Sequence, residues 1–328
     1  MSSAPLAPRR FLAWFFGTTL LALFLLSRVI VAMPMVFFDD AYPLWHYAKT
    51  ARDSVGSKDA RILVLGDSRG QAGLNPDVLG KDINVLAVPG VSPIELYYSF
   101  KHYLQHHQPP AKVVVSLSST HFGFEQLFWE RAIKFGYLDA NETEEVILTG
   151  RRVGDQSLGR RSATTDAWFY RQGAPWLYFP ELRAGVFGGR LAKNRELTAR
   201  VAEGNGHVAY GTADASDGLA YEISHSTFKT MPATIEYLRI LISLAKSVGA
   251  RTEFISLPLN QASLRAMPAA HRDGFVQLMQ QLQREMPSFT AHPQWPEYPN
   301  DHFGDPNHLN ARGAARFSAE FLKQWSTP

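Results

Sequence analysis

Short apolar runs alternate with amphipathic stretches along much of the chain. Four runs rich in β-branched and apolar residues lie at 61–65, 83–88, 112–117 and 252–257, each bounded by turn residues. Runs of this length that are apolar at nearly every position are typical of strands buried on both faces. They predict an α/β fold with a parallel sheet.

Helical patterns lie between and after these runs. Ser92 and Glu95 form a capping box around Pro93, which predicts the start of a helix between the second and third strands. Apolar residues recur at helical spacing over 231–245 and again over 314–321. The alternation of the two patterns predicts helices on both faces of the sheet.

The alternation stops between about residues 121 and 226. This stretch contains aromatic clusters, arginines and glycine-rich turns without a clear period. We interpret it as an inserted cap within a domain that covers residues 41–328. Aromatic residues with arginines can bind sugars or nucleic acid, although they more often form a small local core with a solvated rim.

A long apolar segment lies near the N-terminus. The run from Phe11 to Leu26 has no charge, and apolar character resumes beyond Arg28 as far as Phe38. A bilayer core requires about 20 such residues, and an arginine near one end can reach the interface. Basic residues before the segment and acidic residues after it predict a single-pass, N-in anchor over residues 1–40 in a bacterial inner membrane. The rest of the chain would then be periplasmic or extracellular; a cleaved signal peptide and a buried core helix are the alternatives.

Composition narrows the classes of function. The chain has 328 residues, of which 45% are hydrophobic, so it can bury a full core. Its 33 basic residues against 30 acidic ones give a small net charge, which does not indicate nucleic-acid binding. Because the chain has no cysteine, disulfides, thiolate zinc sites and a cysteine nucleophile are excluded.

A serine lies where open α/β sheets place their ligands. The first predicted strand runs into GDSRG at 66–70, so Ser68 follows the carboxyl end of a strand. A serine hydroxyl becomes a nucleophile when a base held by a carboxylate takes its proton. DPNH at 305–308 offers such a pair, since its spacing lets Asp305 orient His308. Each motif alone fits an ordinary turn, but together they predict a catalytic triad of Ser68, Asp305 and His308.

The two motifs resemble the first and last signature blocks of the SGNH (GDSL) hydrolases, over about residues 60–120 and 250–325. The resemblance implies an SGNH-like (flavodoxin-like) three-layer sandwich with Ser68 as nucleophile. It also implies an oxyanion hole formed by the backbone N–H groups of Ser68 and Gly90. The asparagine that the family carries after the third strand is missing here, and Thr120 or Ser119 lies near its place. One lost donor of this kind costs about 10² to 10³ in rate.

The anchor and the missing asparagine favour a particular branch of this family. The chain resembles membrane-anchored SGNH-like proteins such as the teichoic acid D-alanyl transfer protein and the exopolysaccharide O-acetylation proteins. That resemblance implies acyl transfer, such as O-acetylation, to a cell-surface polysaccharide, without a cofactor and beside a membrane-bound O-acyltransferase. A periplasmic esterase or lipase-like hydrolase and a non-catalytic polymer-binding subunit are the alternatives.

Other charged residues near these motifs allow further interpretations. Arg69, next to the nucleophile, can contact an anionic donor or polymer, although a solvated or salt-bridged arginine is the more common role. His102 and His106 share a helix face at a spacing that can bind zinc, but no third ligand is evident. Acidic residues and histidines at 301–308 make a metallohydrolase the rival enzyme class, and we expect no metal.

Overall fold

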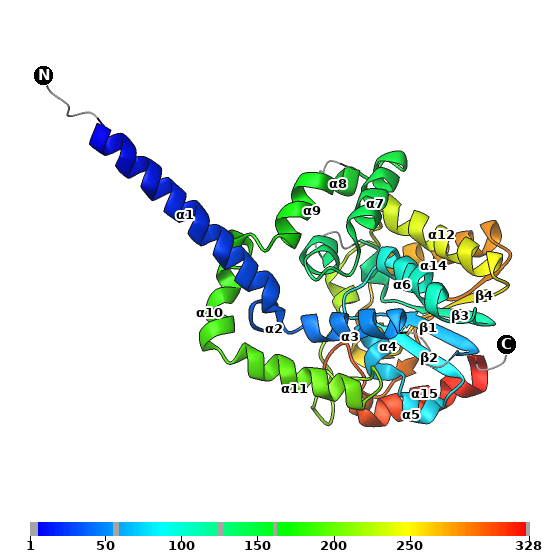
Figure 1. The fold of residues 1–328 in the computed structure, drawn as a ribbon. Helices are drawn as coiled ribbons and strands as arrows, with labels where there is room; N and C mark the ends of the chain where they lie inside the picture. The colour runs from blue at the N-terminus through cyan, green and yellow to red at the C-terminus, as the bar shows by residue number, and fades with distance from the viewer. Residues whose placement is uncertain (1–5, 55–58, 124–126, 160–162, 326–328) are drawn as a thin grey trace, which may run out of the picture.

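Five parallel strands form the central sheet of the computed structural model, which describes residues 6–54, 59–123, 127–159 and 163–325 (Figure 1). The strand order is β2-β1-β3-β4-β6. The four predicted strands are confirmed as β1 (Ile62–Gly66), β2 (Ile83–Ala87), β3 (Lys112–Ser116) and β4 (Arg251–Ile255). The fifth strand, β6 (Phe289–His292), was not predicted, and β5 (Leu259–Asn260) pairs with β7 (Glu297–Tyr298) in a separate small sheet.

Alternate residues of each strand pack into separate cores on the two faces of the sheet. Leu63 and Leu65 of β1 belong to one apolar cluster, and Ile62 and Val64 belong to the other. This double burial explains why β1 is apolar at every position rather than at every second one.

Helices cover both faces of the sheet (Figure 1). The first core includes residues of α3 (Tyr42–Asp53), α6 (Pro93–His106), α12 (Pro232–Ser247) and α14 (Ala269–Glu285). The second core packs against α5 (Pro76–Leu79) and α15 (Ala311–Trp325). The predicted start of α6 is confirmed, since the Ser92 hydroxyl accepts from the Ile94 N–H and the Glu95 carboxylate accepts from the Ser92 N–H.

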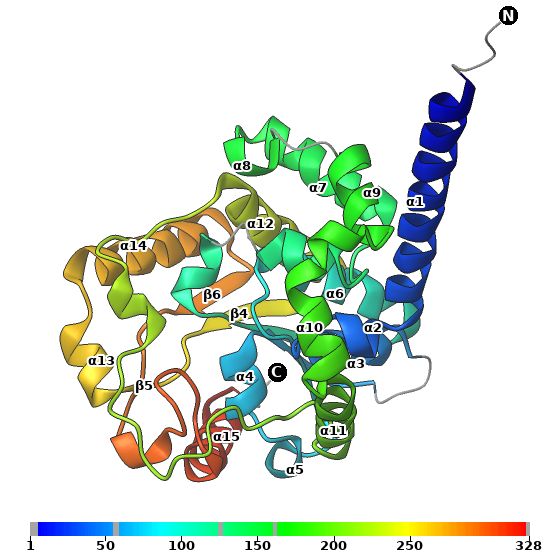
Figure 2. The same ribbon diagram turned by 90° about the vertical axis from the view of Figure 1, so that its left-hand side faces the viewer.

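The stretch interpreted as an insertion is largely helical. Its elements are a π-helical turn (Phe128–Ile133), α7 (Ala140–Arg152), α8 (Gln156–Gly159), α9 (Ala163–Arg171), α10 (Phe179–Phe187) and α11 (Arg190–Glu203). After α11 the chain runs as an extended segment past α4 (Ser68–Gly73) and α15 toward α13 (Gln261–Ala266), as Figure 2 shows. We call residues 205–222 of this segment the strap.

Helix α1 (Leu6–Ala32) projects away from the rest of the chain (Figure 1). Within Pro8–Ala32, the most apolar stretch of 18 residues has a mean hydropathy of 2.0, and only 6% of it is buried. This helix is long and apolar enough to cross a membrane, and its exposure is inconsistent with a core helix.

The apolar run outlasts this helix. Pro34 begins the short helix α2 (Pro34–Phe37), and Phe38 stacks on Tyr178 and Phe135 in a small buried cluster. The last part of the run therefore packs within the folded domain instead of extending the span. Arg28, near the end of α1, donates to the backbone carbonyl and the side chain of Gln172 at 2.8 Å each.

Candidate active site

Ser68 is the first residue of α4, directly after β1. Asp67 caps this helix, and its Oδ1 accepts from the N–H groups of Arg69 and Gly70. Its Oδ2 accepts from the Ser118 N–H at 2.8 Å, which fixes the turn after β1 to the segment after β3. Because the sheet order reverses between these two adjacent strands, the serine lies at the crevice where such sheets bind ligands.

The structure brings Ser68, His308 and Asp305 together. His308 Nε2 lies 2.9 Å from Ser68 Oγ, and His308 Nδ1 lies 2.8 Å from Asp305 Oδ2. Asp305 Oδ1 also accepts from the N–H groups of Asn307 and His308, at 2.7 and 2.8 Å. Burial alone would raise the pKa of Asp305, but the hydrogen bonds from the His308 ring and these amides outweigh it, so the pKa is lowered. The carboxylate therefore stays ionised at neutral pH and can hold the imidazole in one orientation.

A tight loop fixes the spacing of Asp305 and His308. Phe303 and Leu309 form an antiparallel bridge, and the Gly304 N–H donates to the His308 carbonyl at 3.0 Å. The strap closes over this loop. A Cβ on Gly211 would lie 2.0 Å from the Gly304 carbonyl carbon, so the two backbones pack together without room for a side chain.

Tyr210 of the strap stacks on the imidazole of His308. The ring centroids are 4.5 Å apart and the planes are inclined by 22°. The Tyr210 hydroxyl donates to the side-chain oxygen of Gln71 in α4, and His207 Nδ1 lies 2.9 Å from the Gln71 backbone carbonyl. The strap therefore connects the helix that carries the nucleophile to the base. The sequence reasoning missed this role because Tyr210 lies in a stretch without periodicity.

Arg69 points into the protein and pairs with Glu222. Two hydrogen bonds of 2.7 Å each join the guanidinium to the carboxylate, and both side chains are buried. Arg69 Nη2 also donates to Asn307 Oδ1 at 3.0 Å, and Asn307 lies between Asp305 and His308 in the sequence. Burial opposes ionisation of Glu222, but the charge and hydrogen bonds of Arg69 prevail and lower the pKa of Glu222. The structure therefore gives Arg69 the salt-bridged role, and not that of an open contact for substrate.

Gly90 lies in the turn between β2 and α6, with a φ of +75° that favours glycine. A Cβ there would lie 2.7 Å from Arg131 Nη1 and 2.9 Å from Leu127 Cδ1, so these side chains would have to move. This turn follows β2, which is adjacent to β1 in the sheet.

Thr120 and Ser119 are buried in the 3₁₀ turn after β3 (Ser119–Phe122), as is Ser118 just before it. The Thr120 hydroxyl pairs with the Ser118 hydroxyl at 2.9 Å, and within the described part of the chain no hydrogen bond joins Thr120 to Ser68. The next residue, His121, places Nδ1 3.4 Å from Asp67 Oδ2. Burial is the main cause of a lowered pKa for His121. Sequence reasoning did not single out this histidine, although it follows directly on the segment where a donor was expected.

A second serine–histidine pair lies nearby but lacks the third member. Ser119 Oγ is 2.8 Å from His271 Nε2, and Ser119 has no exposed surface. Among the described residues no carboxylate forms a salt bridge with His271. This pair therefore serves as an internal comparison for Ser68, whose histidine is oriented by Asp305.

The other candidate ligands form separate pairs. Asp301 binds His302 at 2.8 Å and Arg312 at 2.5 Å, whereas His102 of α6 contacts Glu142 at 2.6 Å. Over the described ranges, no group of three or more histidine or acidic residues is placed to hold a metal ion.

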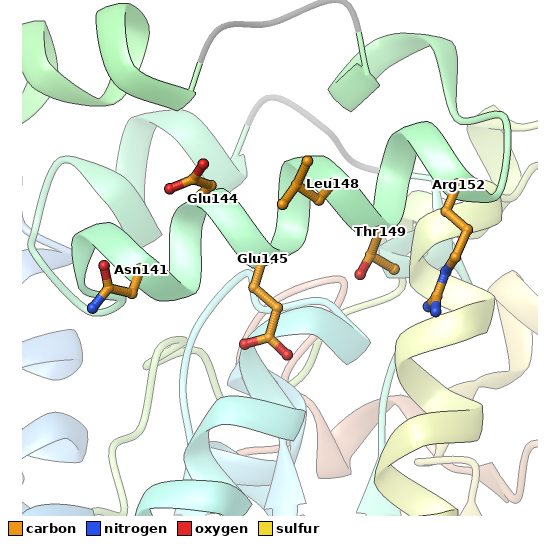
Figure 3. Close-up of a pocket in the computed structure, with 6 residues that line it drawn as sticks. All are labelled: Asn141, Glu144, Glu145, Leu148, Thr149 and Arg152. Carbon is orange, nitrogen blue, oxygen red and sulfur yellow. The ribbon is translucent and has the colours of Figure 1, made fainter.

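A cavity of about 380 Å³ lies along α7 (Figure 3), and no residue of the triad lines it. All of its lining residues come from this one helix, and Glu145 and Arg152 point toward neighbouring helices. Glu145 pairs with Lys101 of α6 and Arg152 with Glu236 of α12. The charged groups here hold helices together, so we do not assign chemistry to this cavity.

No protein-family model matches the chain, and no curated protein matches it.

Proposed function

We propose that this chain is a membrane-anchored serine acyltransferase of the SGNH type, which transfers an acyl group such as acetyl to a cell-surface or exported polysaccharide. The observation that carries the proposal is the continuous hydrogen-bonded series Asp305–His308–Ser68 at the carboxyl end of β1. An ionised carboxylate, an imidazole and a hydroxyl in this order are the requirements for serine nucleophilic catalysis. The parallel sheet with helices on both faces is compatible with the SGNH three-layer fold.

The first half-reaction forms an acyl-enzyme. His308 Nε2 takes the proton of Ser68 Oγ as this oxygen attacks the acyl carbonyl, and a tetrahedral oxyanion results. When the oxyanion collapses, the bond to the leaving group breaks, and His308 gives its proton to that group. The acyl group is then an ester of Ser68, and Asp305 stabilises the imidazolium that forms in between.

The second half-reaction regenerates the enzyme. A sugar hydroxyl gives its proton to His308 and attacks the ester carbonyl, and the Ser68 oxygen leaves and recovers the proton. The acceptor keeps the acyl group, so no proton or electron is gained or lost over the cycle. If water replaces the sugar, the same steps hydrolyse the donor. Ser68 and His308 remain partly exposed, which favours hydrolysis as the second candidate activity.

Two backbone groups are proposed to hold the developing oxyanion. The backbone N–H groups of Ser68 and Gly90 supply two donors, as the family resemblance implies. His121 lies beside Asp67, and burial keeps it neutral, but its ring already has a backbone hydrogen bond with Val91, so we do not assign it as a donor to the oxyanion.

The anchor supports a location beside an acyl donor. A helix that can span the bilayer ends at Ala32, and the folded domain begins within a few residues of it. An N-in orientation would place Ser68 in the periplasm or outside the cell, near the outer surface of the membrane. A membrane-bound O-acyltransferase is the expected partner, because the acyl group must cross that membrane before Ser68 can accept it.

The fate of the acyl group tests this proposal. Full-length protein in detergent would be mixed with p-nitrophenyl acetate, with and without an oligosaccharide acceptor, and free acetate and acetylated sugar would be measured. Acetylated sugar that forms with wild type and falls at least about 10³-fold in Ser68→Ala supports acyl transfer. Ser119→Ala, which alters the internal serine–histidine pair, serves as the matched control and should keep its activity. Release of acetate alone would indicate an esterase, and no turnover at all would indicate a polymer-binding subunit.

A further inference from the structure

A cavity of about 390 Å³ opens beside the triad. Its volume lies within the range of roughly 300–1,000 Å³ that is typical of small-molecule sites. Two of its lining residues also belong to the catalytic region. Tyr210 lines the cavity and stacks on His308, and Pro89 precedes Gly90 in the turn after β2. A molecule bound here therefore contacts the ring that packs on His308 and the turn that carries Gly90.

Two arginines line this cavity, and each is fixed by a backbone carbonyl. Arg131 Nη1 donates to the Pro89 carbonyl at 3.3 Å, and Arg200 Nη2 donates to the Ala209 carbonyl at 3.2 Å. A guanidinium has five N–H donors, so each group retains donors for a ligand. Within the described residues, neither arginine has a carboxylate oxygen within salt-bridge distance. Arg131 acts electrostatically on nearby Asp39, but guanidinium groups without a direct carboxylate contact retain donors that are suited to a carboxylate ligand.

The remaining lining residues favour a sugar over a simple anion. Leu44 of α3, Leu197 of α11 and Val208 of the strap supply an apolar surface, on which the C–H face of a sugar ring can pack. Asp40 adds a carboxylate, which can accept hydrogen bonds from sugar hydroxyls but would repel a small anion. A polyhydroxylated ring that carries one carboxylate satisfies both the arginines and the aspartate.

We propose that this cavity, which we call the Arg131–Arg200 subsite, binds a carboxylate-bearing sugar unit of the acceptor polysaccharide. The proposal rests on the proposed function and adds the chemical class of the acceptor. The carboxylate contacts the arginines, the ring packs between the strap and α11, and a neighbouring hydroxyl points toward Ser68 and His308. The tyrosine shared by the subsite and the base couples acceptor binding to the position of the imidazole.

Binding to the full-length Ser68→Ala protein in a non-ionic detergent tests the subsite without any need for catalysis. The probes are a linear trimer of galacturonate and the neutral trimer maltotriose, each titrated by calorimetry. We expect the galacturonate trimer to bind at least about 10-fold more tightly than maltotriose, as one charge-assisted contact can provide. The difference should shrink between about 50 mM and about 300 mM salt, because both arginines are reached by solvent ions.

Single substitutions locate the binding. Arg200→Gln should weaken binding of the galacturonate trimer about 10-fold, and Arg131→Gln should do so as well. Arg195→Gln is the matched control, because Arg195 is exposed on the same helix α11 but does not line the cavity. Arg200 is also exposed, so its variant should fold normally.

Equal affinity for the two trimers would overturn the proposal, and so would unchanged affinity in Arg200→Gln. The result is separable from the proposed function, because that function is judged by the acetylated sugar that the wild type forms and Ser68→Ala does not. Arginine-dependent binding without any turnover would leave the subsite in place and remove the enzyme assignment. Formation of acetylated sugar without arginine-dependent binding would keep the enzyme assignment and remove the subsite.

Discussion

Glu222→Gln removes the charge that balances Arg69 inside the protein. The side chains of Arg69 and Glu222 are 6% and 0% exposed, and their two contacts are 2.7 Å long. Breaking such a buried pair by altering one partner costs about 3–5 kcal/mol, because a charge is left without a counter-charge in a medium of low polarity. We expect Glu222→Gln to lie near the lower end of this range, since glutamine keeps one acceptor oxygen for the guanidinium.

A double-mutant cycle separates this pairing from simple loss of packing. Arg69→Met combined with Glu222→Leu replaces both charges by apolar groups of similar size, an exchange that is often close to neutral for stability. The double variant should therefore be more stable than the sum of its single variants predicts, by about 2 kcal/mol or more. The free energy of unfolding would be measured by urea-dependent proteolysis of the full-length protein in detergent.

An exposed pair on the surface provides the control for this cycle. Arg239 and Glu285 are joined at 2.8 Å but are 36% and 38% exposed, so Glu285→Gln should cost at most about 1 kcal/mol. The reasoning would be refuted if Glu222→Gln lowered the free energy of unfolding no more than Glu285→Gln does. It would also be refuted if the effects of Arg69→Met and Glu222→Leu on that free energy were additive. Because Arg69 also holds Asn307, the rate of acyl transfer should fall in Glu222→Gln and stay unchanged in Glu285→Gln.

Two further predictions follow from the contacts around the triad. Tyr210→Ala removes the ring that packs on His308 and should lower kcat about 10-fold. Tyr210→Phe keeps the ring, so its kcat should fall less. Equal kcat values in the wild type and Tyr210→Ala would contradict a positioning role for Tyr210. Burial lowers the pKa values of His121, His207 and His271, so the unfolded chain takes up more protons than the folded one below about pH 6.5. The stability that their neutral forms provide is complete above that pH and is lost as the pH falls, by at most about 1.4 kcal/mol per histidine and pH unit. Urea-dependent proteolysis at about pH 7.5 and about pH 5.5 measures the free energy of unfolding at the two pH values. We expect a lower value at about pH 5.5, and a smaller difference between the two pH values in His271→Gln. Equal stability at the two pH values would contradict the prediction.

The strands and helix starts could be predicted where the signal is local. Three of the four predicted strands, β1, β2 and β3, are buried at almost every position, so most of their residues are apolar. The edge strand β6 escaped prediction because only Phe289 among its four residues is buried. The start of α7 carried a usable signal that was overlooked, since Asp139 and Glu142 form a capping box like that of α6.

The triad could be proposed from the sequence because Asp305 and His308 are close neighbours in one loop and Ser68 follows a strand with a strong apolar pattern. The groups that support it were not predictable in this way. Glu222 lies 153 residues from Arg69, and Tyr210 lies 139 residues from Gln71. Both are in the strap, which has almost no regular secondary structure and hence no periodicity that would indicate which side chains face the site.

Selective labelling of Ser68 tests the central claim most directly. Full-length protein would be treated with a fluorophosphonate probe, and the modified peptide would be located by mass spectrometry in the wild type, His308→Ala and Ser119→Ala. We expect labelling of Ser68 that disappears in His308→Ala and persists in Ser119→Ala. The Asp305 carboxylate holds His308, which contacts Ser68, whereas no carboxylate of the described residues forms a salt bridge with His271, which contacts Ser119. A folded protein that is not labelled at Ser68, or is labelled equally without His308, would contradict the assignment of an activated serine.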